Sequence, residues 1–262
     1  MSGRVIFIGA GPGAADLITV RGARLLAQAD VVLFDALTDP ALRELAPRAK
    51  WVNVGKRGYT GVQGSPGFPA CDSTGQTTIN ALLVKHANEV ATVVRLKGGD
   101  PSVFGRLEEE LDALAVAGIA CEIVPGVTAA IAAAAATQRP LTRRGNGRSV
   151  SLTTAMTRDG ALAGARAART ADTEVFYMAG KQLAALARRL LATGWADDTP
   201  VSVVSRAGWP DQLHSDHSIA TLGRASMLHA GRPTVVTVGA GAAPLARSVA
   251  ETRSTIAVAI PS

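Results

Sequence analysis

The residues of this sequence that could do chemistry are two acidic residues and the residues of three glycine-rich turns. The first turn, Gly9–Ala14, follows an apolar run and fits G-x-G-x-x-G/A, and Asp35 ends the next run, where a dinucleotide-binding fold places a ribose-binding acid. Taken alone, this pattern predicts NAD. However, Pro12 has no N–H for a pyrophosphate, and Thr19 is the expected N-cap of a helix that begins too late for its dipole to reach one. Dinucleotide binding is therefore the minority interpretation.

The second and third turns follow two further apolar runs. Lys97–Pro101 contains two adjacent glycines, which let a backbone approach a ligand closely, and Asp100, whose carboxylate accepts from an amine or hydroxyl. Pro125–Thr128 opens an alanine-rich segment, which could permit tight helix packing or let a flat adenine or ribose lie on the main chain. An ordinary strand-to-helix turn competes with each interpretation. Because strand carboxyl ends meet at one edge of an open α/β sheet, the three turns together predict a small-molecule site built from main chain.

Short apolar runs alternate with longer stretches of helical spacing, which is typical of an α/β protein. Strands are predicted at Val5–Ile8, Val31–Phe34, Trp51–Val54, Val90–Leu96, Cys121–Val124, Ser149–Thr154, Glu174–Met178, Val201–Ser205 and Thr234–Val238. Helices are predicted at Val20–Ala29, Thr78–Ala87, Leu107–Ala117, Thr128–Thr137 and Gln182–Ala192. Gln138–Gly147 breaks both periods, so we expect it to link two domains, residues 1–141 and 142–262. The glycine-rich stretch Gly58–Gly75 is predicted to be a long surface loop, and the residues after Pro244 are expected to fray.

Composition narrows the class of protein. The 262 residues are 47% apolar and 18% charged, which allows one or two domains with a sizeable core and excludes a disordered polar chain. Two cysteines, Cys71 and Cys121, lie too far apart for a Cys-x-x-Cys motif and favour a reducing compartment. With no signal-peptide pattern and no tract long enough for a bilayer, a soluble cytoplasmic protein is expected. The four histidines share no ligand spacing, so no metal is expected, and His214–His217 is predicted to cap a hairpin.

The net charge of +6 comes mainly from arginine, since five of the 27 basic residues are lysines. Codon preference is the simplest explanation. Arginine forks also pair carboxylates two bonds at a time, so an arginine-rich surface suits an acidic ligand. The arginines are scattered along the chain and the sequence has ten aromatic residues, which makes nucleic acid a less favoured partner.

Several motifs together resemble the tetrapyrrole methylases, and the likeness spans nearly the whole chain. They are Gly9–Gly13 with Asp16–Thr19, Ala29–Asp35, Val54–Arg57, Arg95–Arg106, Val124–Thr128, Pro140–Thr142 and Tyr177–Gly180. The block Arg95–Arg106 is typical of the members that methylate uroporphyrinogen III. The chain departs from the family pattern twice: the glycine-rich insert replaces a short histidine-containing link, and Arg143 stands where a histidine is usual.

The resemblance implies a homodimer of two α/β domains that holds S-adenosylmethionine in the cleft between them. It implies two successive methylations of uroporphyrinogen III to precorrin-2, the branch to sirohaem and cobalamin, with S-adenosylhomocysteine as the by-product. The implied cofactor contacts are Pro12, Gly98, Gly99, Asp100, Val103, Thr128, Ala129, Met178, Ala207 and Thr234. Asp35 falls on the proton acceptor and Lys56 on the proton donor, although Lys56 could instead bind a substrate carboxylate as a point charge.

A substrate with many carboxylates would give the arginines a use. The candidates are Arg21, Arg57, Arg106, Arg143 and Arg144. Three alternatives stay open. A methyltransferase acting on a later precorrin usually lacks the acid at Asp35. A dinucleotide-dependent oxidoreductase would bind NAD instead of S-adenosylhomocysteine, and a binding module without activity would need neither Asp35 nor Lys56.

Overall fold

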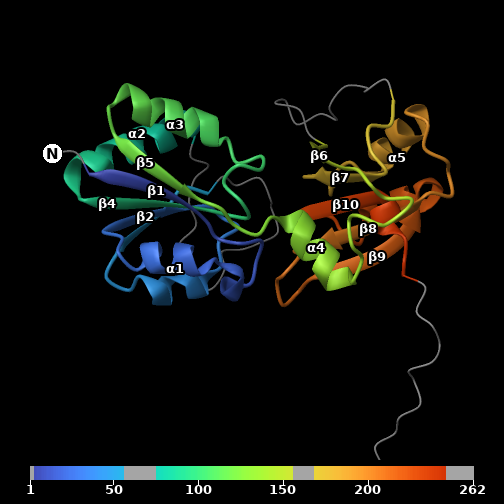
Figure 1. Ribbon diagram of the computed structural model, residues 1–262, viewed down its shortest axis with the longest axis horizontal. Coiled ribbons are helices and arrows are strands. Elements are labelled where there is room, and N and C mark those ends of the chain that lie inside the picture. The colour runs from blue at the N-terminus through green and yellow to red at the C-terminus, as the bar shows by residue number, and fades with distance from the viewer. Residues whose placement is uncertain (1–2, 56–74, 156–167, 246–262) are drawn as a thin grey trace, which may run out of the picture.

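The computed structural model describes residues 3–55, 75–155 and 168–245, which fold into two α/β domains (Figure 1). Within these ranges no helix combines the length and the apolar character that crossing a membrane requires. Lys56, Arg57 and Cys71 lie outside the described residues, as do the predicted loop Gly58–Gly75 up to residue 74 and the chain end from residue 246.

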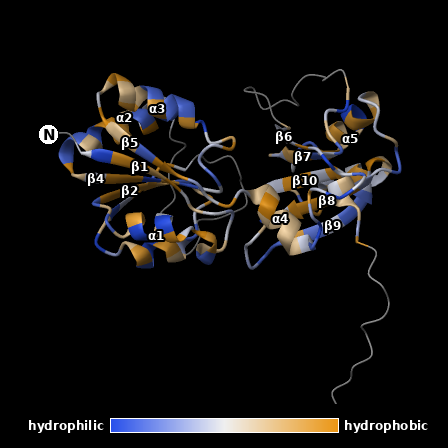
Figure 2. Cartoon of the chain, in the orientation of Figure 1, coloured by the Kyte–Doolittle hydropathy of each residue, from blue (hydrophilic) through white to orange (hydrophobic). Residues whose placement is uncertain are grey.

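The first domain is a parallel sheet with helices on both faces. In spatial order its strands are β3 (Lys50–Asn53), β2 (Val31–Phe34), β4 (Thr92–Lys97), β1 (Arg4–Gly9) and β5 (Ala120–Val124). One face is covered by α2 (Gln76–Glu89) and α3 (Leu107–Val116), and the other by α1 (Val20–Leu26) and the 3-10 turns η1 (Ala15–Leu17) and η2 (Pro40–Leu45). Phe7 packs with α2 and α3, whereas Ile6 and Ile8 pack with α1 and η2. Burial on both faces explains the continuous apolar runs, which Figure 2 shows along β1, β2 and β4.

The second domain is a mixed sheet. Its strands, in spatial order, are β6 (Val150–Thr154), β7 (Thr173–Tyr177), β10 (Thr234–Gly239), β8 (Pro200–Ser205) and β9 (Leu213–Ser218). β6 and β7 run parallel, and the other neighbouring pairs run antiparallel. One face is covered by α5 (Leu183–Ala192) and η3 (Ile219–Ser226), while the short turn η4 (Ala240–Ala242) follows β10.

The opposite face of this second sheet is covered by α4 (Ala129–Thr137) (Figure 1). Its buried residues Ala130, Ala132 and Ala133 pack with side chains of β7, β8 and β10. The chain therefore crosses to the second domain before α4. The expected boundary at Leu141 stays a prediction, and this packing favours a boundary at Pro125–Thr128.

The predicted strands and helices are confirmed in type and order, and their ends shift by up to three residues. Thr19 is confirmed as the N-cap of α1, because its side-chain oxygen accepts from Gly22 N at 3.0 Å. The helix therefore does begin several residues after the first glycine turn.

The prediction that His214–His217 caps a hairpin is wrong, because these residues lie inside β9 and pair antiparallel with β8. The strand was hidden because it lacks an apolar alternation, and Figure 2 shows it as hydrophilic. Polar contacts secure it instead: Asp216 accepts from Arg139, and the His214 ring lies 3.1 Å from the Ser202 hydroxyl.

A chain of hydrogen bonds runs from β9 through the interior to β10. His217 Nε2 bonds the Ser215 hydroxyl at 2.8 Å, which bonds His229 Nε2 at 2.8 Å. His229 Nδ1 bonds the Ser205 hydroxyl at 2.5 Å, and that hydroxyl bonds Thr234 at 2.8 Å. His229 is fully buried. Burial lowers the pKa of His229 to about 4, with a further contribution from neighbouring positive charge.

This pKa predicts how stability depends on pH. The unfolded chain binds a proton at His229 near pH 6.5, whereas the folded protein resists it down to about pH 4. The contribution of His229 is therefore complete above pH 6.5 and falls by at most about 1.4 kcal/mol per pH unit as the pH drops toward 4. Urea unfolding of the wild type and His229→Asn across this range measures the difference. The variant should show the shallower dependence on pH, and an equal slope in both proteins would contradict the assignment.

Candidate active site

The three glycine turns meet backbone to backbone at the carboxyl ends of β1, β4 and β5. Gly11 and Gly99 form an isolated antiparallel bridge, in which Gly11 N donates to Gly99 O at 3.3 Å and Gly99 N donates to Gly11 O at 2.7 Å. A Cβ on Gly9 would lie 2.5 Å from Gly126 Cα and 2.8 Å from Gly99 O. The predicted convergence is confirmed, and no side chain fits where the turns touch.

Asp100 ties the second turn to the third. Its Oδ2 accepts from Gly126 N at 2.8 Å, while Oδ1 accepts from Ser102 N at 2.8 Å. Both carboxylate oxygens therefore hold main chain in place. Each oxygen has a second lone pair, so the carboxylate retains capacity to accept from a ligand hydroxyl or amine.

Asp35 stands at the end of β2, beside the second turn. Its Oδ2 accepts from Gly98 N at 3.1 Å, and its Oδ1 accepts from Leu37 N at 3.1 Å and from the Thr38 hydroxyl at 3.4 Å. These bonds fix the carboxylate at the same edge as the glycine turns. Its partly exposed position allows it to reach a bound molecule.

A buried ionic cluster supports the second turn from below, and the sequence analysis missed it. Glu110 of α3 accepts from Arg95 Nε at 3.0 Å and from Lys97 Nζ at 2.6 Å, and all three side chains are almost completely buried. Burial and the adjacent Arg95 charge lower the pKa of Lys97, and the Glu110 carboxylate opposes them. Two basic residues alternating within an apolar strand were the available signal.

The second domain adds an aromatic and polar group. The Thr128 hydroxyl and the Tyr177 hydroxyl lie 2.8 Å apart, and the Phe104 ring packs on Tyr177 with centroids 5.0 Å apart. A tyrosine hydroxyl is protonated at neutral pH and can donate, and burial raises the pKa of Tyr177 further above its ordinary value. Tyr177 was not among the predicted contacts, although it directly precedes Met178.

Four non-glycine residues near these loops adopt left-handed backbone conformations. They are Phe104 (φ 52°), Arg106 (φ 54°), Met178 (φ 57°) and Arg206 (φ 51°). Such conformations cost about 1–3 kcal/mol each and concentrate at functional sites. Phe104 and Met178 are also 42% and 37% exposed, so both side chains are accessible at the surface.

The other predicted cofactor contacts lie at different depths. Val103 and Ala129 pack beside the alanines of α4, in the cluster to which Ala207 belongs. Ala207 and Thr234 are buried, and the Thr234 hydroxyl donates to Arg232 O at 2.8 Å. Thr234 is therefore tied into the interior of the second domain by its own hydrogen bonds.

Pro12 lies where the two domains touch. Its carbonyl oxygen accepts from the indole N–H of Trp209 at 3.0 Å. Trp209 and Ala207 lie on the same loop after β8. The bond therefore joins Pro12, a predicted cofactor contact in the first domain, to the loop that contains Ala207, a predicted cofactor contact in the second domain.

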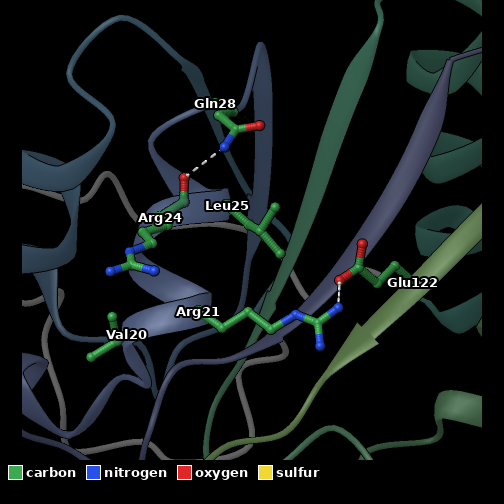
Figure 3. Close-up of a pocket in the computed structure, with 6 residues that line it drawn as sticks. All are labelled: Val20, Arg21, Arg24, Leu25, Gln28 and Glu122. Carbon is green, nitrogen blue, oxygen red and sulfur yellow. Dashed lines mark hydrogen bonds and ion pairs between the residues drawn. The ribbon is translucent and has the colours of Figure 1, made fainter.

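Arg21 is separate from the other predicted site residues. It lines a hollow of about 590 Å³ formed by α1, Gln28 and β5, and its guanidinium donates to Glu122 Oε1 at 2.5 Å. Figure 3 shows the side chains that line this hollow. The lining of this hollow includes none of the glycine turns.

The remaining basic candidates differ in their surroundings. Arg106 donates two hydrogen bonds of 2.6 Å to the carboxylate of Glu109. These bonds are the largest cause of the raised pKa of Arg106. Arg143 donates to Ala243 O, and Arg144 is exposed. Among the described residues, no group of three or more His, Cys, Asp or Glu side chains is arranged to hold a metal ion.

The comparisons with known proteins show the family. Residues 4–223 match the model of the Tetrapyrrole (Corrin/Porphyrin) Methylases, and the chain belongs to this family. A uroporphyrinogen-III C-methyltransferase from Pseudomonas aeruginosa is 42% identical over 241 residues, 91% of this chain and 94% of that protein. A siroheme synthase from Hahella chejuensis is 42% identical over 214 residues. The matched region is 80% of this chain and 43% of that longer protein.

Solved structures agree with this assignment. A uroporphyrin-III C-methyltransferase from Thermus thermophilus, complexed with S-adenosylhomocysteine, has a TM-score of 0.76 and 33% identity, covering 90% of this chain and 97% of that one. A cobalt precorrin-4 methyltransferase has a TM-score of 0.76 and 30% identity, covering 92% and 96%. The expected fold is confirmed, and S-adenosylmethionine is the cofactor of this enzyme class. The dinucleotide interpretation of the first turn has no support.

The residues present fit such a cofactor. Gly99 has φ +73°, and a Cβ built there would meet nothing nearer than Thr128 Cα at 3.8 Å. The second turn therefore faces the start of α4 across an ordinary contact distance, and it presents main chain there with no side chain at Gly99. This is the kind of surface on which a flat nucleoside can lie.

The contact among the turns predicts the effect of a single methyl group. Gly9→Ala should destabilise the protein by about 2–3 kcal/mol, because its Cβ would press on backbone atoms that cannot rotate away. Gly223→Ala is the control, since its Cβ would meet Ala184 at an ordinary 3.5 Å. Chemical denaturation of both variants measures the difference. Equal stability of the two would show that the turns do not depend on this contact.

The bonds of Asp100 predict a variant that loses the cofactor and keeps the fold. Asp100→Ala frees the third turn from the second, so we expect affinity for S-adenosylhomocysteine to fall at least 100-fold while stability falls by about 1–2 kcal/mol. Asp39→Ala is the matched control, because its carboxylate caps η2 through Ala41 N at 2.9 Å. Calorimetric titration measures both. Unchanged affinity in Asp100→Ala would contradict this role.

Proposed function

We propose that this chain is an S-adenosylmethionine-dependent C-methyltransferase that converts uroporphyrinogen III to precorrin-2 by two successive methylations. The observation that carries the proposal is the meeting of the Gly11, Gly99 and Gly126 turns around Asp100, in a chain that belongs to the tetrapyrrole methylases. A relative that is 42% identical over nearly its whole length bears this activity in its name.

Main chain would do most of the cofactor binding. The proposed contacts are Pro12, Gly98, Gly99, Asp100, Val103, Thr128, Ala129, Met178, Ala207 and Thr234. The bound sulfonium supplies an already activated methyl group, so the protein's task is to hold that methyl and the pyrrole carbon close, aligned and away from water. The exposed side chains of Phe104 and Met178 support this role, because apolar groups at the site exclude water.

Asp35 is the proposed proton acceptor. After the pyrrole carbon takes the methyl group, the cationic adduct must lose a proton, and a carboxylate can receive it. The bonds from Gly98 N and Leu37 N hold the carboxylate in place. Lys56 is proposed either as the proton donor or as a point charge for a substrate carboxylate, as the resemblance implies.

Substrate carboxylates would meet arginines around the site. Arg106 is kept because it follows Gly105, which packs against Pro101 of the second turn, but its Nε and Nη2 already donate to Glu109, so a substrate carboxylate would have to share or displace that pairing. Arg57 and Arg143 complete the proposed set. Arg21 is not included, because it pairs with Glu122 in a separate hollow.

The family resemblance further implies a homodimer, and we propose the same for this chain. From its composition and sequence patterns we also propose that it acts in the cytoplasm, with neither nucleic acid nor a membrane as partner. A methyltransferase acting on a later precorrin is the second candidate. The similarity to a cobalt precorrin-4 methyltransferase at 30% identity favours keeping it.

Counting transferred methyl groups tests the proposal. The protein is incubated anaerobically with methyl-labelled S-adenosylmethionine and uroporphyrinogen III, and the product is analysed by mass spectrometry. We expect two labelled methyl groups per tetrapyrrole. No transfer to uroporphyrinogen III, together with transfer to a more methylated precorrin, would favour the second candidate.

A variant of Asp35 tests the chemical step in the same assay. Asp35→Asn keeps one oxygen for Gly98 N and removes the base, so turnover should fall about 10²–10⁴-fold while S-adenosylhomocysteine still binds. Asp39→Asn, which alters a nearby capping carboxylate, should retain activity. Full activity of Asp35→Asn would remove Asp35 from the mechanism.

A further inference from the structure

We propose that Trp209 is a positioning residue that latches the two domains together and so sets the affinity for S-adenosylmethionine. The inference rests on the proposed binding of that cofactor between the domains. The sequence analysis did not single out Trp209. It lies on the loop after β8, and its indole N–H donates to Pro12 O, across the boundary between the domains, at 3.0 Å.

The first domain is shaped to receive this ring. A Cβ on Gly13 would lie 2.5 Å from Trp209 Cδ1 and 2.7 Å from its Nε1, so the indole fills the space that a side chain would need. Gly208, with φ +81°, packs within about 3.6 Å of Pro12 and Leu17 by the same measure. The indole ring therefore packs against the backbone at Gly13, and the backbone at Gly208 packs against Pro12 and Leu17.

The loop that presents the ring is braced from within its own domain. The guanidinium carbon of Arg206 lies 4.2 Å from the centroid of the Trp209 ring, and Arg206 Nε donates to Asp211 Oδ1 at 2.7 Å. Arg232 donates to Asp211 O at 2.9 Å, and Gly208 N donates to Gln212 Oε1 at 3.0 Å. These contacts hold the indole in one orientation before any ligand arrives.

The position of the latch links it to the cofactor. Pro12 accepts the bond, and Ala207 precedes the ring by two residues; both are proposed cofactor contacts. When only a fraction of molecules has the two domains in the binding arrangement, the apparent affinity falls by that fraction. A bond that holds them in place therefore raises affinity without touching the ligand.

Trp195 provides a matched control within the same chain. Its indole N–H donates to Glu174 Oε2 at 3.2 Å, and the guanidinium carbon of Arg169 lies 4.0 Å from its ring centroid. The two tryptophans thus make the same kinds of contact. Trp195, however, lies within the core of the second domain and bridges nothing between the domains.

The experiment compares Trp209→Phe, Trp209→Ala and Trp195→Phe with the wild type by calorimetric titration with S-adenosylhomocysteine. We expect about tenfold weaker binding for Trp209→Phe, which loses one hydrogen bond, and a larger loss for Trp209→Ala. Trp195→Phe should bind within twofold of the wild type. The KM for S-adenosylmethionine should rise in parallel while kcat stays close to the wild-type value, whereas general unfolding would lower kcat and leave KM unchanged.

A double-mutant cycle with Gly13→Ala adds an independent test. The added methyl should weaken binding more in the wild type than in Trp209→Ala, which lacks the two atoms nearest to the new Cβ and keeps the third, the Ala207 carbonyl oxygen at 2.9 Å. Equal losses in both backgrounds, or wild-type affinity in both Trp209 variants, would overturn the latch. A wild-type protein that fails to bind S-adenosylhomocysteine would overturn the proposed function itself.

Discussion

The candidate site depends on one constraint: three turns approach so closely that their main-chain atoms are in direct contact and leave no room for side chains between them. Gly9 and Gly126 lie where any Cβ would overlap a neighbouring main-chain atom, and Gly99 has a φ of +73°, which L side chains rarely adopt. The turns fix one another by this contact, and Asp100 adds a charged acceptor that spans two of them. The turns therefore present main chain where they touch, because no side chain fits at Gly9 or Gly126. The buried Arg95–Glu110–Lys97 cluster then keeps the end of β4 in register with these neighbours.

The two domains contribute different properties to this site, and α4 makes them mechanically dependent. The first domain supplies the turns and Asp35, while the second supplies Tyr177, Met178 and the loop of Ala207. The third turn belongs to the first sheet, yet the helix that it opens packs on the second. A displacement of one domain therefore pulls directly on the turn that Asp100 holds. The hydrogen bond between Thr128 and Tyr177 stiffens this junction further.

Much of this arrangement could be predicted from the sequence, because strong local signals specify it. Buried parallel strands read as apolar runs, and glycine turns mark their ends. Three features could not be predicted. The side of the molecule on which α4 packs was hidden, since a helix almost entirely of alanine has no polar face to orient it. The strand β9 was hidden because its stability comes from pairing and polar contacts. The contact of Trp209 with Pro12 joins residues far apart in sequence, and no local pattern encodes such a meeting.

The polar character of β9 has a consequence for the behaviour of the protein in concentrated solution. Within residues 3–55, 75–155 and 168–245 this strand is at the edge of its sheet, so none of these residues forms a strand beside its outer N–H and C=O groups. An apolar edge in this position would invite a strand from another molecule to extend the sheet. Here the incoming strand would have to strip water from serine, histidine and aspartate side chains at every step. The same residues that concealed the strand from sequence patterns thus protect the folded chain against growth into cross-molecular sheets.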